Sequence, residues 1–417
     1  MLISQIGGWT SDMWGPIINL FGFIQNWGWM IVVFTICLKL ILSPLDFWQR
    51  KVARKSALKQ AALQPELVKI QKKFGNNRQM LNQKTMELYR RENVNMFGSC
   101  ISMLVNLVLT LFIFLTLFYG LMGISKTETI NEYAKLQEYY NTQFASAYSI
   151  KVDEVKTKEA EIWNQAYENA KTELGENAKE EEIYSKALEN YSNTVVSGSE
   201  VTGDLVKIST IQESVLKYYN ENVKESWLWV KNVWRPDTNA SGFSNYATFA
   251  TTTNFYDTEN YKKVLNERLS GITDESEKST ITKNVQNEFR DKYNFVTYNL
   301  QQEYSSWNGY FILVILAAVV TYLSVTISQM QSSKKQKRNQ EMENPANPGK
   351  AMKIMKFILP IIMIIFTIGY SAVFALYIVT NSIMATIISF VCLKIFEKQE
   401  KKQKVTITTK NRPDYSR

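Results

Sequence analysis

Charge-free apolar runs alternate along this chain with strongly polar stretches. Several of the runs approach the ~20 residues that a helix needs to cross a bilayer. The run from Ile354 to Ile395 is too long for one crossing, and Gly369 to Ala372 offer a turn in its middle. The pattern therefore predicts an all-α polytopic membrane protein with five transmembrane helices, at residues 27–43, 100–122, 308–328, 354–371 and 373–393.

The polar segments around the first two spans predict two further elements. Residues 1–26 form an outer-face interfacial segment, whose amphipathic part we expect to lie along the membrane surface. Pro44 is expected to end the first span. Residues 44–99 carry apolar residues at helical spacing on both sides of a turn at Phe74–Asn77, with Lys and Arg between them. This pattern predicts a basic helical hairpin.

The segment 123–307 is long enough for a domain of its own. It reads as long helices over 127–225, a Thr/Ser/Asn-rich linker over 236–256, and a further helix over 258–305 that continues into the third span. Its frequent aromatic residues favour a packed core over a binding surface, because buried aromatics are the commoner use. They include Tyr139, Tyr140, Tyr218, Tyr219, Trp227 and Trp229.

Charge predicts the orientation of the chain. The segment 44–99 has 12 basic and 4 acidic residues, and 123–307 has 20 and 29. The loop 329–353 has 6 and 2, and the tail 394–417 has 8 and 3. Positively charged loops stay in the cytoplasm. We therefore expect the hairpin, loop and tail to be cytoplasmic, and the N-terminus and the acidic segment to lie outside.

The composition argues against catalytic chemistry. The chain has no His, which removes the commonest general base and the commonest metal ligand. Its three cysteines, Cys37, Cys100 and Cys392, lie in or beside apolar runs without CxxC spacing, which favours a packing role. No nucleotide-binding or nucleophile motif is present, and no basic residue precedes Lys39, so we expect no cleavable signal peptide. We expect no catalytic residue, no cofactor and no metal.

Lys39 is a charge inside the first predicted span. A charge at the bilayer centre costs at least ~2.5 kcal/mol. Lys39 lies close enough to the cytoplasmic end to snorkel to the headgroups, and this alternative stays open beside a water-filled cavity. Thr35 lies one turn earlier on the same helix face. Since no acidic residue falls within any predicted span, Lys39 is expected to lack a partner within the protein.

Several segments resemble the YidC/Oxa/Alb family of membrane protein insertases. The segment NWGWMIVVFTICLKLILSPLDFWQRK resembles the first core helix, with a basic residue five positions before Pro-Leu. LQPELVKIQKKFGNNRQMLNQKTMELYRRENVN resembles the cytoplasmic hairpin, and SWLWVKNVWRPDT a short outer segment. ILAAVVTYLSVTISQMQ and MKIMKFILPIIMIIFTIGYSAVFALYIVTN resemble the last three core helices. The likeness covers most of the chain outside 123–307.

The resemblance implies a five-transmembrane-helix insertase core with a cytoplasmic helical hairpin, and here a large, mostly helical extracellular insertion. It implies a hydrophilic groove, open to cytoplasm and lipid and closed outside, in which Lys39, Thr35 and Tyr377 contact substrate. Lys39 occupies a position where the family usually has Arg. Lysine keeps the positive charge but lacks the planar guanidinium group that binds a carboxylate through two hydrogen bonds. Two further departures are Asn95-Met96 in place of Asn-Pro and the length of the outer insertion.

The function that the resemblance implies is insertion and folding of membrane proteins in the bacterial plasma membrane. The partners would be nascent membrane-protein clients and the lipid bilayer. The basic tail and hairpin make the ribosome a candidate partner, and the Sec translocon is another. Two alternatives stay open, a small-solute transporter and a surface receptor. A transporter predicts a second polar path or inverted repeats, and a receptor requires neither Lys39 nor the basic hairpin.

Overall fold

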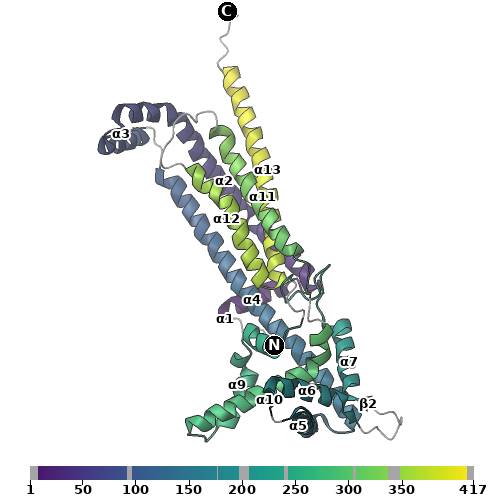
Figure 1. Ribbon diagram of the computed structural model, residues 1–417. Coiled ribbons are helices and arrows are strands. Elements are labelled where there is room, and N and C mark those ends of the chain that lie inside the picture. Colours follow the sequence, from purple (N-terminus) through teal and green to yellow (C-terminus); the bar gives the residue numbers. More distant parts are fainter. Residues whose placement is uncertain are drawn as a thin grey trace, which may run out of the picture. The chain divides into compact units, whose positions relative to one another are not determined.

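The computed structural model describes residues 8–91, 96–175, 177–196, 206–238, 243–303, 307–336 and 348–410. The predictions for 1–7, Asn95, 337–347 and 411–417 fall outside these residues. The fold is almost wholly helical (Figure 1). The helices are α1 Gly8–Asn19, α2 Trp27–Phe74, α3 Arg78–Arg91, α4 Met96–Tyr148, α5 Val155–Leu174, α6 Glu180–Asn193, α7 Ile208–Tyr218, α8 Tyr246–Thr253, α9 Glu259–Leu269, α10 Glu275–Glu303, α11 Ile312–Gln336, α12 Pro348–Gly369 and α13 Ala372–Lys410. Strands β1 Val195–Val196 and β2 Val206–Lys207 pair antiparallel.

The chain divides into two compact units. Unit 1 comprises Met1–Trp29, Tyr119–Ile312 and Ile368–Phe374, and unit 2 comprises Met30–Phe118, Leu313–Thr367 and Ala375–Arg417. All five apolar helices, α2, α4, α11, α12 and α13, contribute residues to both units. Each unit therefore combines segments that are far apart in the sequence.

Three helices in the described residues are long and apolar enough to cross a membrane. They are Trp27–Val52, Val108–Tyr148 and Ala372–Phe396. Ile312–Ile327 and Lys356–Gly369 are shorter apolar helices. The described part of the chain thus holds three helices of spanning length and two shorter ones where the hydrophobic pattern predicts five spans.

The helices of unit 2 contact one another through aromatic side chains. Phe47 of α2 stacks on Phe396 of α13 with ring centroids 5.2 Å apart. The ring centroids of Tyr322 in α11 and Phe357 in α12 lie 6.1 Å apart. Phe118 of α4 meets Phe366 of α12 edge-on at 5.8 Å. These pairs join α2 to α13, α11 to α12 and α4 to α12.

The end of α2 and the helix α3 form a helical hairpin within unit 2. Leu63 and Leu88 are buried, and Leu67, Ile70 and Tyr89 pack against them. The side chain of Asn77 accepts hydrogen bonds from the first amides of α3, which starts the second helix. Arg91 and Glu66 form an ion pair at 2.6 Å across the two helices.

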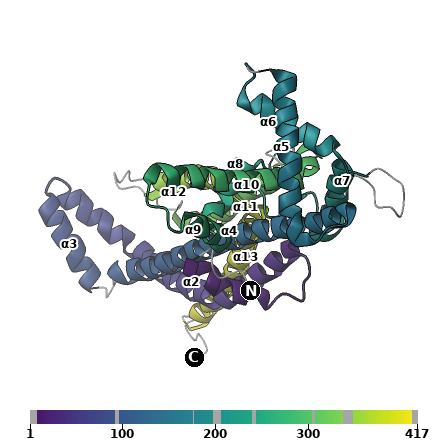
Figure 2. The ribbon, with the colours of Figure 1, turned by 90° about the horizontal axis from the view of Figure 1, so that it is seen from below.

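Unit 1 is built on a core of aromatic residues. Tyr133, Leu136, Tyr140 and Phe144 recur at helical spacing along α4 and are all buried. α5 and α6 lie side by side (Figure 2), and Trp163 joins them to the core through Tyr191 and Phe295. Helices α7, α8, α9 and α10 contribute most of the other buried members, and Val196, Tyr219, Val223, Phe243 and Phe255 lie in the segments between the α-helices.

The predicted core role of the aromatic residues is confirmed for several of them. Tyr140 and Tyr219 are fully buried and Trp227 nearly so. Tyr139 and Tyr218 stack on each other with ring centroids 4.1 Å apart and pack against the core. These contacts leave their rings little area for a binding surface.

The expectation that Pro44 ends the first helix is wrong. α2 continues without a break from Trp27 to Phe74. A proline lacks the N–H that would bond to the carbonyl four residues earlier, here Leu40. The hydroxyl of Ser43 donates to that carbonyl at 2.8 Å. A neighbouring side chain thus satisfies the group that the proline leaves without a backbone donor.

Three boundaries in the long polar segment also differ from the prediction. α4 runs on to Tyr148 because its apolar stripe continues into the core of unit 1. The predicted linker 236–256 contains α8, which Asn245 caps and whose Tyr246 and Phe249 are buried. The helix expected over 258–305 is two helices, α9 and α10, and α11 starts only at Ile312. Phe311, in a left-handed conformation with φ of 60°, precedes that start.

Candidate functional site

A polar stripe follows one face of α2. Thr35, Lys39, Ser43, Asp46 and Arg50 fall within one narrow arc of the helix, because residues four and seven positions apart share a face. Thr35 is buried, and its hydroxyl donates to the carbonyl of Ile31 at 2.6 Å. The stripe begins inside the apolar helix Trp27–Val52 and reaches its end. These polar side chains interrupt the apolar surface of the helix along one face.

Lys39 has an acidic partner, contrary to the prediction. Its ammonium lies 3.1 Å from the Oδ2 of Asp46, and the two side chains are 16% and 19% exposed. The sequence pattern missed this partner because Pro44 was taken as the end of the span, which left Asp46 in a loop. The spacing of seven residues along a continuous helix is the signal that places the two charges together. Lys39 therefore rests in an ion pair.

Every long helix of unit 2 contributes a buried hydroxyl to the interior. Thr367 of α12 and Ser389 of α13 bond to backbone carbonyls of their own helices. Thr321 on α11 is buried, and its oxygen has no hydrogen-bond partner among the described residues. The buried hydroxyls are those of Thr35, Thr116, Thr321, Thr367, Tyr377, Thr380 and Ser389.

Tyr377 is one of these interior residues. It lies six positions into α13, and its side chain is 4% exposed. Thr35 and Lys39 share a face of α2, whereas Tyr377 enters from another helix. α2 and α13 meet through Phe47 and Phe396. The three predicted residues thus belong to one unit and to two helices that touch.

Unit 1 contains a second feature, which we call the clasp, Glu225–Thr238. Trp227 and Val230 exchange two backbone hydrogen bonds, of 3.0 and 2.8 Å, which close a two-residue turn. The rest of the clasp has no regular structure. Its buried polar side chains are Asn232, Arg235, Asp237 and Thr238.

The clasp is bonded to the chain next to all five apolar helices. Asn26 donates to the carbonyl of Ser226 at 2.7 Å, just before α2. Ser125 of α4 donates to the carbonyl of Trp234 at 3.0 Å. The amide of Ala372, the first residue of α13, donates to the carbonyl of Arg235 at 2.8 Å.

Asn308, ahead of α11, holds the centre of the clasp. Its side-chain amide donates to the carbonyls of Asn232, Arg235 and Pro236 at 2.8–3.2 Å. Its Oδ1 accepts from the amide of Asn232 at 2.8 Å. One side chain thereby satisfies four backbone groups of an irregular buried segment, as buried polar groups require. Sequence reasoning assigned no role to Asn308, because its partners lie about 70 positions away.

Asp237 fixes the end of the clasp. Its Oδ1 accepts from the amide of Tyr310 at 2.8 Å, and its Oδ2 from the indole of Trp229 at 3.1 Å. Gly309 lies so close that an added Cβ would overlap the Asp237 carboxylate. The backbone approaches the carboxylate closely only because this residue is glycine.

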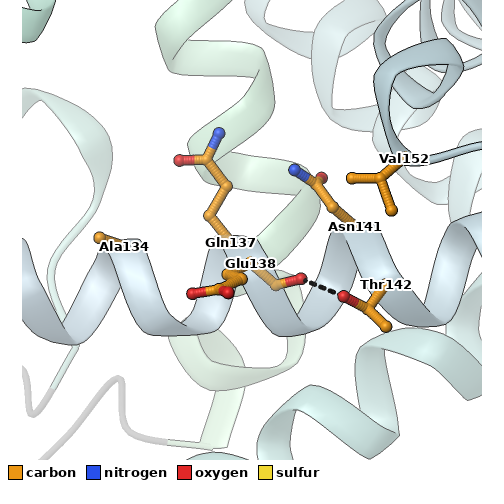
Figure 3. A pocket seen from close by; sticks show the side chains of 6 residues that line it. All are labelled: Ala134, Gln137, Glu138, Asn141, Thr142 and Val152. Carbon is orange, nitrogen blue, oxygen red and sulfur yellow. Dashed lines mark hydrogen bonds between the residues drawn. The ribbon is translucent and has the colours of Figure 1, made fainter.

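A surface hollow of about 380 Å³ lies on α4 in unit 1 (Figure 3). It is lined by Ala134, Gln137, Glu138, Asn141, Thr142 and Val152. Its one internal hydrogen bond runs from the Thr142 hydroxyl to the carbonyl of Glu138, within the same helix. It includes none of the residues predicted to contact substrate. Within the described residues no cluster of His, Cys, Asp and Glu could hold a metal ion.

Comparison with known proteins shows similarity to membrane protein insertases over part of the chain. A family model described as 60Kd inner membrane protein matches residues 19–163. A "Membrane protein insertase YidC" from Fusobacterium nucleatum is 43% identical over 100 residues, which cover 24% of this chain and 47% of the relative. One from Dechloromonas aromatica is 35% identical over 120 residues, covering 28% and 20%. One from Laribacter hongkongensis is 28% identical over 150 residues, covering 34% and 26%.

The family model covers the first part of the chain and leaves much of unit 1 unmatched. The chain spans between a fifth and about half the length of these curated relatives. The matched region includes the polar stripe of α2 and the helical hairpin that follows it. No solved structure gives a significant match.

Proposed function

We propose that this chain is a bacterial membrane protein insertase of the YidC/Oxa family, which inserts its clients and helps them fold. The observation that carries the proposal is the Lys39–Asp46 pair within an apolar helix. Charges inside a span are costly and usually mark a path for a polar substrate. The polar stripe gives a client's hydrophilic segment a place to enter.

The topology that we propose has five spans, with α11 and α12 as short ones. The positive-inside bias places the hairpin and the tail in the cytoplasm, and the N-terminus and the insertion 123–307 outside. The clasp supports this arrangement, because its hydrogen bonds tie the chain beside each apolar helix into unit 1. A segment so bonded suits the closed, outer side of a groove.

The mechanism rests on shortening the apolar path. A polar segment is expensive to move through ~30 Å of hydrocarbon. Buried hydroxyls on α2, α4, α11, α12 and α13 would line a groove with hydrogen-bonding groups and water. The short helices α11 and α12 would also thin the bilayer nearby. The client's own apolar helix then moves into lipid, and this transfer drives the process.

The Lys39–Asp46 pair adds an exchange step. In the resting protein Asp46 neutralises Lys39, which lowers the cost of holding both charges in the membrane. An acidic residue of the client would take the place of Asp46 on the ammonium. No covalent bond is made or broken, so we propose a non-enzymatic role. Lys39, Thr35 and Tyr377 are the residues that we expect to contact the client.

The test is insertion of a single-span client with an acidic outer tail. Lys39→Arg should insert the client as well as the parent protein, Lys39→Ala several-fold less, and Lys39→Glu least, since it places two carboxylates together. Asp46→Asn should retain insertion, because it frees the ammonium. Lys51→Glu is the matched control, an exposed lysine on the same helix. Equal insertion by all Lys39 variants would remove this residue from the mechanism. Depletion that affects solute uptake and spares insertion would favour a transporter, and depletion that affects neither would favour a surface receptor.

The ribosome and the Sec translocon are the further partners that we propose. The basic tail 394–417 would bind the phosphate-rich ribosome surface with an affinity that falls steeply with salt. Ribosome co-sedimentation with and without residues 397–417 tests this. Unchanged binding after truncation would leave the tail with a role in topology alone.

The helical insertion is proposed as an accessory module outside the insertion machinery. Its aromatic residues form its own core, which leaves them unavailable to a client. Shortening 127–225 and 238–305 to brief linkers, with Trp227–Asp237 retained, should preserve insertion of a simple client. A folded, membrane-embedded variant that has lost insertion would place the module in the mechanism.

A further inference from the structure

The turn at the start of the clasp exposes a leucine under strain. Trp227 and Val230 pair with each other, which leaves Leu228 and Trp229 as a two-residue loop. Leu228 has a φ of 49° and is 65% exposed. A positive φ at the first position of such a loop normally calls for glycine, and it is unfavourable for a branched side chain. Contact with water does not stabilise an exposed leucine in this strained conformation.

The turn is fixed against the first residues of α2. The ring centroids of Trp227 and Trp29 lie 5.5 Å apart in an edge-to-face arrangement, and those of Trp229 and Trp227 also lie 5.5 Å apart. Gly28 lets Trp227 approach, since a Cβ there would overlap its indole. The Asp237 carboxylate accepts from the indole N–H of Trp229. The apex therefore has a defined position beside the beginning of α2.

That position sets the depth of the turn relative to a bilayer. Trp29 lies two residues into the apolar helix Trp27–Val52 and is 48% exposed. Tryptophans at the ends of spans mark the boundary between hydrocarbon and headgroups. A residue held against Trp29 is at the same boundary. Trp307 and Tyr310, also exposed and just before α11, repeat the pattern.

We propose that the Trp227–Val230 turn inserts Leu228 into the outer leaflet of the bilayer and so anchors unit 1 at a fixed depth. The occupant of this apolar surface is lipid, because the surface continues from the start of a spanning helix. Trp229 would lie at headgroup level with its indole N–H bound to Asp237. The inference rests on the proposed function only in taking α2 as a membrane span.

The test is a depth measurement on the full chain in lipid nanodiscs. Cys37, Cys100 and Cys392 are replaced by alanine, and a single cysteine at position 228 carries an environment-sensitive NBD label. Lipids with a spin label high on the acyl chain are the quencher. NBD at 228 should be blue-shifted and quenched at least two-fold. Leu174→Cys is the matched control, an exposed leucine at the end of α5, and its label should be unquenched.

Two further variants separate the possible outcomes. Ile41→Cys on α2 reports whether that helix is in lipid at all. Quenching at 41 without quenching at 228 would overturn the lipid anchor and leave the span intact, and would indicate a protein partner for the turn. No quenching at 41 would overturn the span itself. Leu228→Gly, which suits the positive φ, keeps the turn folded and should increase the fraction of total tryptophan fluorescence that aqueous iodide quenches, because Trp29, Trp227 and Trp229 lie beside the turn. An unchanged fraction would also contradict the anchor.

Discussion

The two units use their apolar residues in opposite ways. In unit 1, Tyr140, Phe249 and Tyr293 lie at most 1% exposed in a common core. In unit 2, Ile41, Phe112 and Ile365 are 54–75% exposed along helices with few charges. An apolar side chain is stable where its surroundings are apolar. Unit 1 supplies those surroundings itself, whereas unit 2 requires lipid to supply them.

Polar groups show the same contrast. Unit 1 joins distant segments through them, as Lys292 does with Glu159 at 2.6 and 2.7 Å and Asn308 does within the clasp. In unit 2, Thr35 and Ser389 bond to carbonyls of their own helices. A hydroxyl that bonds within its own helix, as that of Thr35 does, does not hold two segments together through that hydrogen bond. The polar groups of unit 1 hold its fold together.

The largest expected effect is on the buried ion pair of unit 1. Lys292→Met leaves the Glu159 carboxylate buried without its partner, which should destabilise unit 1 by about 3–5 kcal/mol. Lys158→Met, which breaks an exposed pair with Glu161, is the control and should cost less than about 1 kcal/mol. Hydrogen exchange of α5 and α10 in the full chain measures both. Equal protection from hydrogen exchange in the two variants would show that the buried ion pair contributes no more to stability than the exposed one.

The same variant should acquire a pH dependence. Burial raises the pKa of the Glu159 carboxyl above 4.5, and loss of Lys292 raises that pKa further. The folded state then holds a proton that the unfolded state has lost, so stability falls as pH rises above about 4.5. Unfolding midpoints of Lys292→Met and the parent should lie closest at low pH and diverge toward neutral pH. A difference between the two unfolding midpoints that becomes smaller as pH rises would contradict this prediction.

The clasp should be sensitive to a single methyl group. Gly309→Ala pushes a Cβ into the Asp237 carboxylate and should cost about 1–3 kcal/mol through overpacking. Gly369→Ala is the control, since no atom lies within 4 Å of its Cβ position. Thermal unfolding of the full chain in nanodiscs compares them. Equal unfolding midpoints for the two variants would show that the clasp accommodates the added methyl group without loss of stability.

Exposed apolar residues should respond differently in the two units. Ile365→Gln should destabilise the protein in lipid by about 1–2 kcal/mol, because a polar side chain replaces one solvated by hydrocarbon. Leu174→Gln in unit 1 should be neutral, since its side chain already faces water. Unfolding in nanodiscs reports both. A neutral Ile365→Gln would indicate that this face of α12 is not in lipid.

The smallest effect on stability is expected at Thr35. Thr35→Val removes a hydroxyl that is bonded to its own helix and should change stability by less than about 0.5 kcal/mol. Insertion of the acidic client should fall nonetheless if Thr35 lines the groove. Thr253→Val is the matched control, because it removes a buried hydroxyl that is bonded to its own helix in unit 1. An unchanged insertion rate would exclude Thr35 from the client's path.

The amino-acid sequence by itself determined the features that depend on local periodicity. The apolar runs located the helices α2, α4, α11, α12 and α13, and the turns at Phe74–Asn77 and Gly369–Ala372 fall between helices. The family resemblance named Lys39, Thr35 and Tyr377, and the structure places all three in unit 2. Such patterns repeat every few residues and need no knowledge of distant contacts.

Only the tertiary structure decided the features that depend on contacts between distant residues. The continuity of α2 through Pro44 is a local exception, since Ser43 satisfies the freed carbonyl and Asp46 reaches Lys39 within one helix. The extension of α4 to Tyr148 depends on a core assembled from six other helices. The clasp has no regular structure, so its shape comes from contacts of Asn308 and Gly309 with residues about 70 positions earlier, such as Asp237. Burial and pairing energies act between such positions only after the chain has folded, which is why the sequence pattern carries no mark of them.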